Sequence, residues 1–495
     1  MLAVTEPLGP GLDPDAMAYL HAAGSLAHRG VLLDVRDDWV SPDSTRPLTR
    51  WPPGFSVAIA GPIALGASPV PAARFVMALA AFITLAALAW VVSGAAGVAA
   101  GAVTALVLLV TPAMAIVHES VLSEPLFLAT LALTLAAMVR ARPGPLVEGA
   151  AAAAASMVRY AGLSAIGAVV LWELTRAGPW RDRARRTAIA AAPGALVNAW
   201  WWARAAYVGG RGAVRDFSVY GEIGYTLREG AGTGAGWLAP VLAPPWSALL
   251  ATGVVGALVI TAGLGARRSA LGSSTAGLGA RHSALGSTRT VLGASALIAG
   301  CYLGLVLAAR VLADPNIPLD ERILVPAMVF VTAAAAVPIA AWWRGAASWS
   351  RVVGAVALVA WGVGSVVVTR DLTRYALETG NDYADICWRG SPVIAWVREH
   401  GAGHALLSNA SVAVFFQADR VAREMPTDMR ADLLARFADT LAARRAYVVL
   451  FDQSCASTIE QPDSLVGALG LVAEARLSTG SVWRAPERPP PDAPR

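Results

Sequence analysis

The chain has 495 residues, of which 56% are hydrophobic and only 15% are charged. Soluble globular proteins carry about 25% charged residues, so this composition excludes an ordinary soluble enzyme and indicates a polytopic membrane protein. The net charge of +5 is compatible with a nucleic-acid partner, so the positions of the arginines decide whether one is expected. Three cysteines are too few for a disulfide scaffold or a cysteine-rich metal site.

The fourteen residues before Asp15 show no membrane span and no signal-peptide pattern, and we predict that residues 1–50 form an extracytoplasmic loop. Asp13 fits the N-cap of a helix, and Pro14 fits its first turn, where the missing N–H costs nothing. We expect this interfacial helix to end at Gly30 and to place Asp15 and Tyr19 on one face. Both aspartates could be caps, but one cap is enough, so Asp15 is the better candidate for a functional role.

Apolar stretches of about 20 residues, long enough to cross a bilayer as helices, follow one another through residues 51–370. A shorter apolar stretch, 54–67, indicates an interfacial or half-inserted helix. The predicted spans lie near 73–93, 95–117, 121–139, 147–175, 188–207, 237–262, 291–311, 323–342 and 352–370. The interrupted stretch 147–175 predicts two short helices that meet near Arg159, which gives an all-α bundle of about 9–11 membrane helices.

A second acidic group falls in a predicted turn between two spans. Pro125 suits a first helical turn and places Glu124 at a helix N-terminus, where the helix dipole favours an anion. Glu124 could act as a base or orient a hydroxyl, and a simple cap is an equal alternative. The nearby pair His118-Glu119 gives two further candidate substrate-binding residues, although no motif assigns their roles.

Two arginines are candidates for binding a phosphate, which a guanidinium matches bidentately. Arg159 interrupts an apolar stretch, where an arginine at mid-bilayer costs about 2.5–3.5 kcal/mol on insertion scales, so a functional role is favoured over snorkelling to the interface. Arg322 follows Asp320-Glu321 just before a late span. It could hold a phosphate, pair with the neighbouring acids, or lie in a solvated loop.

Arginines in short loops set the expected orientation. If residues 1–50 lie outside, the inner loops contain Arg140, Arg142, Arg176, Arg181, Arg183, Arg185, Arg186, Arg267, Arg268, Arg281, Arg289, Arg344 and Arg351. This distribution follows the positive-inside rule, explains the net positive charge and argues against a nucleic-acid partner. Residues 261–290 contain a duplication with a period of 14 residues, TAGLGARRSALGS followed by TAGLGARHSALGS, which indicates a flexible cytoplasmic linker.

After residue 370 the composition becomes that of a soluble protein. The runs 405–408 and 447–451 are typical of strands and 428–444 of a helix, so we predict a small extracytoplasmic α/β domain over 371–485. The proline-rich end, 486–495, is typical of a disordered tail. We predict that Cys387 and Cys455 in this domain pair, with two buried thiols as the alternative, while Cys301 lies within a span.

Together these motifs resemble those of the GT-C class of integral membrane glycosyltransferases, which use polyprenyl-phosphate-linked sugars. The class includes protein mannosyltransferases, aminoarabinose transferases, and bacterial mannosyl- and arabinosyltransferases. The resemblance covers about residues 13–340. In chain order, it rests on Asp15-x-x-x-Tyr19, Trp51-Pro52-Pro53-Gly54-Phe55, Ser123-Glu124-Pro125-Leu126-Phe127, Val158-Arg159-Tyr160-Ala161-Gly162-Leu163 and Glu321-Arg322-Ile323-Leu324-Val325-Pro326. The family's usual first membrane helix has no counterpart in the residues that precede Asp15, so a truncated, inactive member is one expectation.

The resemblance implies a multi-pass plasma-membrane enzyme that transfers a sugar, with inversion, from a polyprenyl-phosphate donor to an extracytoplasmic acceptor. That acceptor would be a cell-envelope glycan, a lipid or a protein. Asp15 would be the catalytic base and Glu124 the second acidic site residue, while Arg159 and Arg322 would contact the donor phosphate. We group Tyr19 with the substrate-binding residues. No cofactor is assigned, although a divalent metal could assist.

Two other classes of function compete with this interpretation. In a transporter or flippase of a lipid-linked glycan, Arg159 and the acids would line a pathway. Transporters commonly contain inverted repeats, whereas the two halves of this chain show no repeat and its acids gather on one side of the membrane, which favours the enzyme. A non-catalytic scaffold that presents the C-terminal domain is the third possibility.

Overall fold

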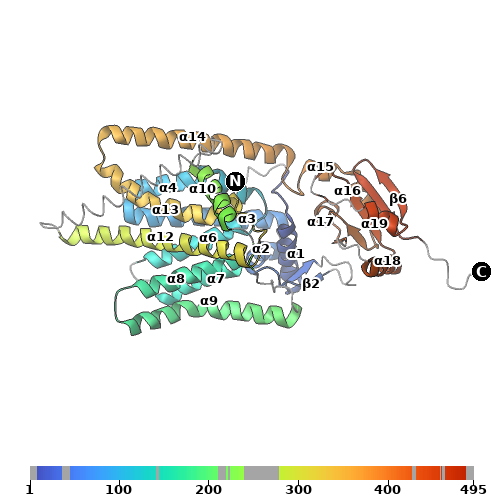
Figure 1. Ribbon diagram of the computed structural model, residues 1–495, viewed down its shortest axis with the longest axis horizontal. Helices are drawn as coiled ribbons and strands as arrows, with labels where there is room; N and C mark the ends of the chain where they lie inside the picture. The colour runs from blue at the N-terminus through green and yellow to red at the C-terminus, as the bar shows by residue number, and fades with distance from the viewer. Residues whose placement is uncertain are drawn as a thin grey trace, which may run out of the picture.

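The computed structural model describes residues 8–35, 45–140, 144–209, 219–220, 223–238, 278–425, 431–456, 459 and 463–486. A helical bundle is followed by a smaller C-terminal domain built on a sheet (Figure 1). The bundle contains α2 (Gly54–Ala64), α3 (Pro69–Ala96), α4 (Val98–Val110), α5 (Pro112–Glu119), α6 (Glu124–Val139), α7 (Pro145–Val158), α8 (Leu163–Thr175), α9 (Trp180–Gly209), α10 (Ile223–Leu238), α12 (Leu278–Leu312), α13 (Glu321–Gly345) and α14 (Ser348–Thr379).

Four helices in the described chain are long and apolar enough to cross a membrane: α3, the Thr288–Leu312 part of α12, α13 and α14. The pair α4 and α5 makes a fifth candidate span, bent by 57°. The shorter apolar helices of 10–17 residues are α2, α6, α7 and the segment Tyr160–Thr175. The predicted all-α, multi-pass membrane bundle is confirmed, but fewer full-length spans lie in the described residues than the 9–11 that we expected.

Two predicted boundaries differ from the structure. Residues 95–117 do not form one straight span, because Pro112 has no N–H to continue the hydrogen bonding of α4 and starts a new helix in another direction. The predicted linker 261–290 overlaps α12, which begins at Leu278, inside the second copy of the duplication. The first copy of the duplication, nearly all of the predicted span 237–262 and residues 487–495 of the predicted tail lie outside the described residues.

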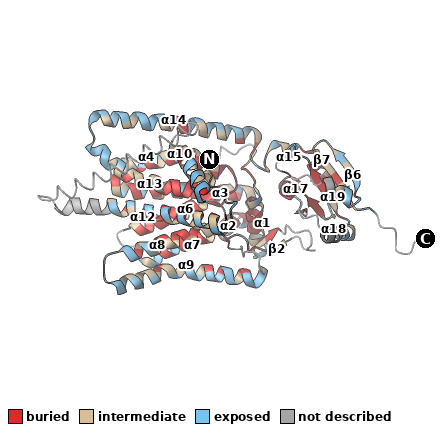
Figure 2. Cartoon of the chain, in the orientation of Figure 1, coloured by how far each residue is buried: buried red, intermediate tan, exposed pale blue. Residues whose placement is uncertain are grey.

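The bundle buries its apolar side chains along the inner faces of its helices (Figure 2). By contrast, α14 is largely exposed along its length, with apolar side chains such as Trp349 and Val359 on its surface. A helix that is apolar and exposed is stable where lipid surrounds it, so α14 fits the membrane boundary of the bundle.

The C-terminal domain has a five-stranded mixed sheet in the order β4-β3-β5-β7-β6. Its strands are β3 (Leu406–Ser408), β4 (Ala422–Glu424), β5 (Tyr447–Phe451), β6 (Val472–Leu477) and β7 (Gly480–Arg484). The strand β3 pairs in parallel with β4 and with the central strand β5, whereas β7 pairs antiparallel with β5 and β6. Both predicted strands are confirmed as β3 and β5, and the predicted helix between them is α18 (Ala431–Arg444).

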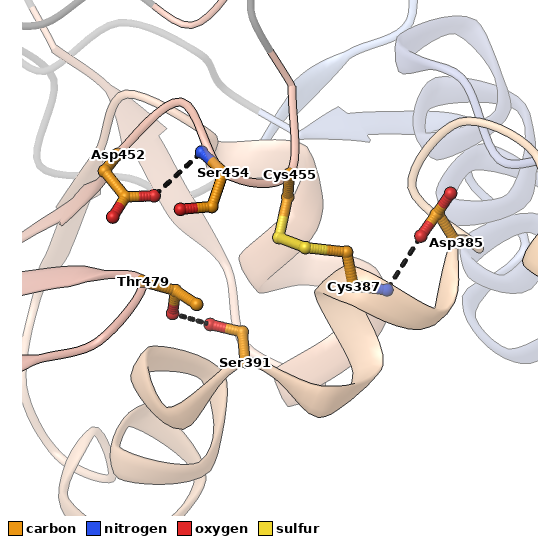
Figure 3. Close-up of a disulfide and its surroundings, with 7 residues drawn as sticks. All are labelled: Asp385, Cys387, Ser391, Asp452, Ser454, Cys455 and Thr479. Atoms are coloured by element: carbon orange, nitrogen blue, oxygen red, sulfur yellow. Dashed lines mark hydrogen bonds between the residues drawn. A yellow bond between two sulfur atoms is a disulfide. The ribbon is translucent and has the colours of Figure 1, made fainter.

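A disulfide joins Cys387 to Cys455 and confirms the predicted pairing (Figure 3). It links α15 (Ile386–Gly390) to the turn after β5, and the two Cα atoms are 5.4 Å apart. Asp385 caps α15 by accepting a hydrogen bond from Cys387 N at 2.7 Å, and the hydroxyls of Ser391 and Thr479 lie 2.7 Å apart. The start of the domain is therefore tied to its sheet by a covalent bond and by hydrogen bonds.

The two ends of the bundle differ in what they carry. The helix α1 (Pro14–Arg29) and the hairpin of β1 (Leu33–Val35) and β2 (Thr45–Pro47) lie at the end that faces the C-terminal domain (Figure 1). The α8–α9 and α13–α14 connections, which belong to the arginine-rich loops, lie at the opposite end. The relative placement of these parts at opposite ends is as predicted, and which end faces outside stays a prediction.

Candidate functional site

The helix α1 positions the first two acidic side chains. Asp13 caps it by accepting a hydrogen bond from Ala16 N on Oδ1 at 2.8 Å, and Gly30 ends it in the left-handed region at a φ of 71°. Its buried face packs on α2 through Tyr19, whose ring meets Phe55 edge-on at 5.2 Å. With this apolar face fixed, the first turn of α1 is held at the bundle surface.

Arg322, in the first turn of α13, joins three carboxylates. Its Nε donates to Glu124 Oε1 at 2.6 Å, its second guanidinium nitrogen to Asp13 at 3.3 Å, and its third to Asp15 at 3.2 Å. A planar guanidinium presents several donors in a fixed fork, so one arginine can hold all three groups. Asp13 therefore has two roles, because one of its oxygens caps α1 and the other pairs with Arg322.

Arg159 reaches the same glutamate from the other side. It forms an ion pair with Glu124 Oε2 at 2.7 Å and donates a hydrogen bond to the Ser123 hydroxyl at 2.9 Å. The Tyr19 hydroxyl lies 3.3 Å from the same serine oxygen. Glu124 consequently binds a different arginine with each carboxylate oxygen. We call Asp13, Asp15, Glu124, Arg159 and Arg322 the carboxylate–arginine cluster.

Exposure decreases from the outer part of the cluster to its base. The side chains of Arg322 and Asp15 are 28% and 26% exposed, whereas Glu124 is 2% exposed. Burial, and the negative charge of neighbouring Asp15, raise the pKa of Asp13 to about 7, although Arg322 opposes this shift. A substrate that enters from solvent would therefore meet Asp15 and the guanidiniums before it met Glu124.

The break at Arg159 depends on two close backbone approaches. Val158 ends α7, Arg159 is extended, and a 3-10 turn over Tyr160–Gly162 leads into α8. A Cβ on Gly162 would lie 2.3 Å from the carbonyl carbon of Ala155, and one on Gly54 would lie 2.6 Å from Met157 O. Only glycine fits at these two positions, so both glycines of the quoted motifs help to place Arg159.

The structure brings together five of the seven residues that we singled out. Asp15, Glu124, Arg159 and Arg322 lie in the cluster, and Tyr19 contacts it through Ser123. The other two contact different groups. His118 Nδ1 bonds to Met114 O, and the Glu119 carboxylate accepts from the side chain of Asn381 at 3.3 Å. Their predicted role in binding substrate has no contact with the cluster to support it.

Sequence reasoning missed three contributors to the site. Asp13 was assigned only to the helix cap, because nothing in the sequence shows that its second oxygen faces Arg322. Ser123 stands in the quoted motif and precedes Glu124, which was the available signal. Tyr302 is buried in α12 and donates to Ile323 O at 2.6 Å, beside Arg322, and no local pattern marks it.

Among the described residues, no group of three or more His, Cys, Asp or Glu side chains is arranged to hold a metal ion. Asp13, Asp15 and Glu124 come near one another, but each is paired with the guanidinium of Arg322. These carboxylates therefore form an ion-pair network with Arg322.

Solved structures share this architecture over nearly the whole chain. ArnT from Cupriavidus metallidurans bound to undecaprenyl phosphate has a TM-score of 0.59 at 14% identity, covering 97% of this chain and 96% of that one. The apo form of ArnT has a TM-score of 0.50, with the same identity and coverage. The oligosaccharyltransferase AglB from Archaeoglobus fulgidus scores 0.47 at 10% identity, covering 90% of this chain and 66% of that one, which is too distant to support the assignment.

Comparison by sequence alone identifies no further related protein. No protein-family profile matches the chain, and no curated protein matches its sequence. The fold assignment therefore depends on the shared three-dimensional arrangement. The full-length likeness to ArnT shows that this chain has the GT-C fold of integral membrane glycosyltransferases.

Proposed function

We propose that this protein is a membrane glycosyltransferase that moves a sugar from a polyprenyl-phosphate donor to an extracytoplasmic acceptor, with inversion. One observation carries the proposal: Arg322 holds Asp15 and Glu124 together, and Glu124 also holds Arg159. A candidate base and two phosphate-binding guanidiniums thus share one cluster. The undecaprenyl phosphate bound in the ArnT structure supports a donor of this chemical class.

In the proposed reaction, Asp15 acts as the base. Its carboxylate takes the proton of an acceptor hydroxyl while the hydroxyl oxygen attacks the anomeric carbon of the donor sugar. The new C–O bond forms as the bond between the sugar and the phosphate breaks, and the electron pair leaves with the polyprenyl phosphate. A single displacement from the face opposite the phosphate inverts the anomeric configuration.

Arg322 and Arg159 would stabilise the negative charge that grows on the leaving phosphate. Guanidiniums are suited to this task because they match phosphate oxygens bidentately and remain charged in a partly buried site. Each arginine is already positioned by a carboxylate of the cluster, so little reorganisation is needed when the donor arrives. No acid is required for the leaving group, since a phosphate departs as an anion.

Glu124 fits a different role from Asp15. Its side chain is 2% exposed, and each of its oxygens is already paired with an arginine guanidinium. An acceptor hydroxyl would have to displace a guanidinium to reach it. We therefore assign Glu124 to holding Arg159 and Arg322 in position, and proton transfer to the more exposed Asp15.

The direct test is a transfer assay on the purified full-length chain in lipid nanodiscs with radiolabelled polyprenyl-phosphate sugars. Asp15→Asn should reduce transfer by about 10²–10⁴-fold, the usual contribution of a positioned base, while undecaprenyl phosphate still binds. Asp371→Asn, the same substitution at an exposed position on α14, is the matched control. Full activity in Asp15→Asn would remove the catalytic assignment.

A second substitution series tests the phosphate-binding role. Arg159→Ala should weaken undecaprenyl phosphate binding by roughly 10–100-fold, the value of a hydrogen bond to a charged group. Arg159→Lys should recover only part of the loss, because lysine keeps the charge but not the fork. Arg351→Ala, an exposed arginine at the start of α14, should bind like the unmodified protein. Equal binding by all three variants would contradict this role.

A further inference from the structure

A two-residue extended segment, Gly11-Leu12, lies between the bundle and the C-terminal domain. On one side, Gly11 N donates to Glu119 O at 2.8 Å, and Val121 N donates to Gly11 O at 2.9 Å. On the other side, Tyr383 N donates to Leu12 O at 3.1 Å. Both pairings are isolated parallel β-bridges, and we call the three bridged segments, 11–12, 119–121 and 381–383, the ladder.

Each segment of this ladder leads directly to another part of the molecule. The segment of Gly11 and Leu12 continues into the first turn of α1, which carries Asp13 and Asp15. The segment 119–121 continues into the start of α6, which carries Glu124. The third segment, 381–383, connects α14 to α15 of the C-terminal domain. The ladder therefore sets the start of α1 beside the start of α6.

Side chains fix the register of the ladder. The Ser120 hydroxyl donates to Asp382 Oδ2 at 3.0 Å, and this hydrogen bond occupies the space beside Gly11. A Cβ on Gly11 would lie 2.2 Å from the serine oxygen and 2.8 Å from the aspartate oxygen. Asp382 itself has a positive φ of 53°, an uncommon conformation for a residue with a side chain. A strained backbone conformation of this kind is kept in a folded protein when the surrounding contacts stabilise it.

The C-terminal domain holds the third segment firmly. Gln417, on α17 (Ser411–Ala418), donates to Tyr383 O at 2.6 Å. The Tyr383 ring lies 5.3 Å from the ring of Trp388, which is 2% exposed in the core of the domain. Arg389 of the same domain also donates to Leu8 O, just ahead of the segment 11–12. The domain thus contacts the N-terminal segment as well as its own connection.

We infer that Gly11, Ser120 and Asp382 are positioning residues for the proposed reaction, through which the C-terminal domain sets Asp15 against Glu124 and the arginines. The inference rests on the proposed function. The packing of Tyr19 and its neighbours on α2 keeps α1 in the bundle without the ladder. Loosening the ladder therefore leaves the chain folded and the donor bound, and it removes the fixed position of the base.

The test compares Gly11→Ala, Ser120→Ala and Asp382→Ala with two matched controls in the full-length protein. Gly24→Ala changes a glycine on α1 whose added Cβ meets nothing within 4 Å, and Ser25→Ala removes a buried hydroxyl at the far end of the same helix. Asp382→Asn is the conservative variant, because asparagine keeps an acceptor oxygen and tolerates positive φ.

Amide hydrogen exchange tests the ladder independently of any enzyme activity. The amides of Gly11, Val121 and Tyr383 should exchange at least tenfold faster in the three test variants than in the unmodified protein. Gly24→Ala and Ser25→Ala should leave these amides unchanged, and Asp382→Asn should lie close to the unmodified protein. Unchanged exchange in Gly11→Ala would overturn the inference, whether or not the protein proves to be a glycosyltransferase.

The transfer assay then separates positioning from general stability. With a radiolabelled polyprenyl-phosphate sugar that the unmodified protein uses, kcat should fall at least tenfold in the test variants, while KM for the donor stays within about twofold. Asp382→Asn should restore most of kcat. Faster exchange without a fall in kcat would overturn the positioning role, and an unmodified protein without transfer would instead contradict the proposed function.

Discussion

At the scale of single residues, Asp13 shows how one side chain can serve two structures. One oxygen caps α1, the other accepts from Arg322, and burial raises the pKa of this carboxyl to about 7. Because the folded protein holds the proton more tightly than the unfolded chain, ionisation of Asp13 opposes folding. Its contribution to stability is complete below about pH 4, and it is lost as the pH rises through about 7.

The raised pKa of Asp13 predicts how the stability of the protein depends on pH. Between pH 5 and pH 7 the free energy of unfolding should fall by about 1 kcal/mol per pH unit through this group. Asp13→Asn keeps a capping oxygen but cannot ionise, so it should flatten this part of the profile. Chemical denaturation of the detergent-purified protein at several pH values measures the slope. Asp320→Asn, the same substitution at the N-cap of α13, should keep the slope because Asp13 is still present. If the stability of Asp320→Asn did not change with pH, a group other than Asp13 would cause the slope.

The sequence predicted individual site residues where chemistry and local position agreed. An arginine inside an apolar stretch and a carboxylate at a helix N-terminus both stand out locally, and both Arg159 and Glu124 lie in the cluster. Contacts that depend on tertiary packing gave no local signal. The approach of Arg322 to Asp13 crosses 309 residues of sequence, and the contact of Glu119 with Asn381 crosses 262.

At the scale of elements, the approach of α2 to the end of α7 helps to place Arg159. Gly54→Ala would put a Cβ 2.6 Å from Met157 O, so the helices must separate. We expect a loss of about 1–3 kcal/mol, the usual cost of overpacking, and weaker binding of undecaprenyl phosphate. Thermal unfolding and a lipid-binding assay measure the two effects.

Gly61→Ala provides the comparison within the same helix. A Cβ there meets nothing within 4 Å, so this variant should unfold and bind like the unmodified protein, or be slightly more stable. If Gly54→Ala and Gly61→Ala behaved alike, the close approach of α2 to α7 would have no part in placing the arginine.

Helices and strands were predicted correctly where a short stretch of sequence marks them. The Asp-Pro start and glycine end of α1, the break at Arg159 and the strands β3 and β5 are all present. The bend between α4 and α5 was missed although Pro112 marks it, because the hydropathy of the whole stretch masked the interruption. Helix lengths were also less predictable, since α6 and α7 are shorter than a typical span and are held in the bundle by packing.

At the scale of the whole molecule, α1 and the C-terminal domain lie at one end of the bundle and the arginine-bearing connections at the other (Figure 1). The cluster includes Asp13 and Asp15 at the start of α1. We therefore predict that position 408 faces the outside and positions 181 and 344 face the inside. Ser408 itself is buried in β3, so the test uses the exposed position 399 of the same domain together with positions 181 and 344. Single cysteines at these three positions are treated with an impermeant thiol reagent on intact cells. Labelling of position 399 only after permeabilisation would reverse the orientation and place the cluster inside.

Ser120 and Asp382 are 262 residues apart in sequence, and their hydrogen bond closes the ladder beside the cluster. A growing polypeptide contains all five cluster residues by the time Arg322 has been synthesised, but it still lacks the segment 381–383 and the domain that holds it. Release from the ribosome and folding of the C-terminal domain would then be the events that complete the site. A nascent or C-terminally cut chain would then hold the donor in the membrane but transfer its sugar slowly.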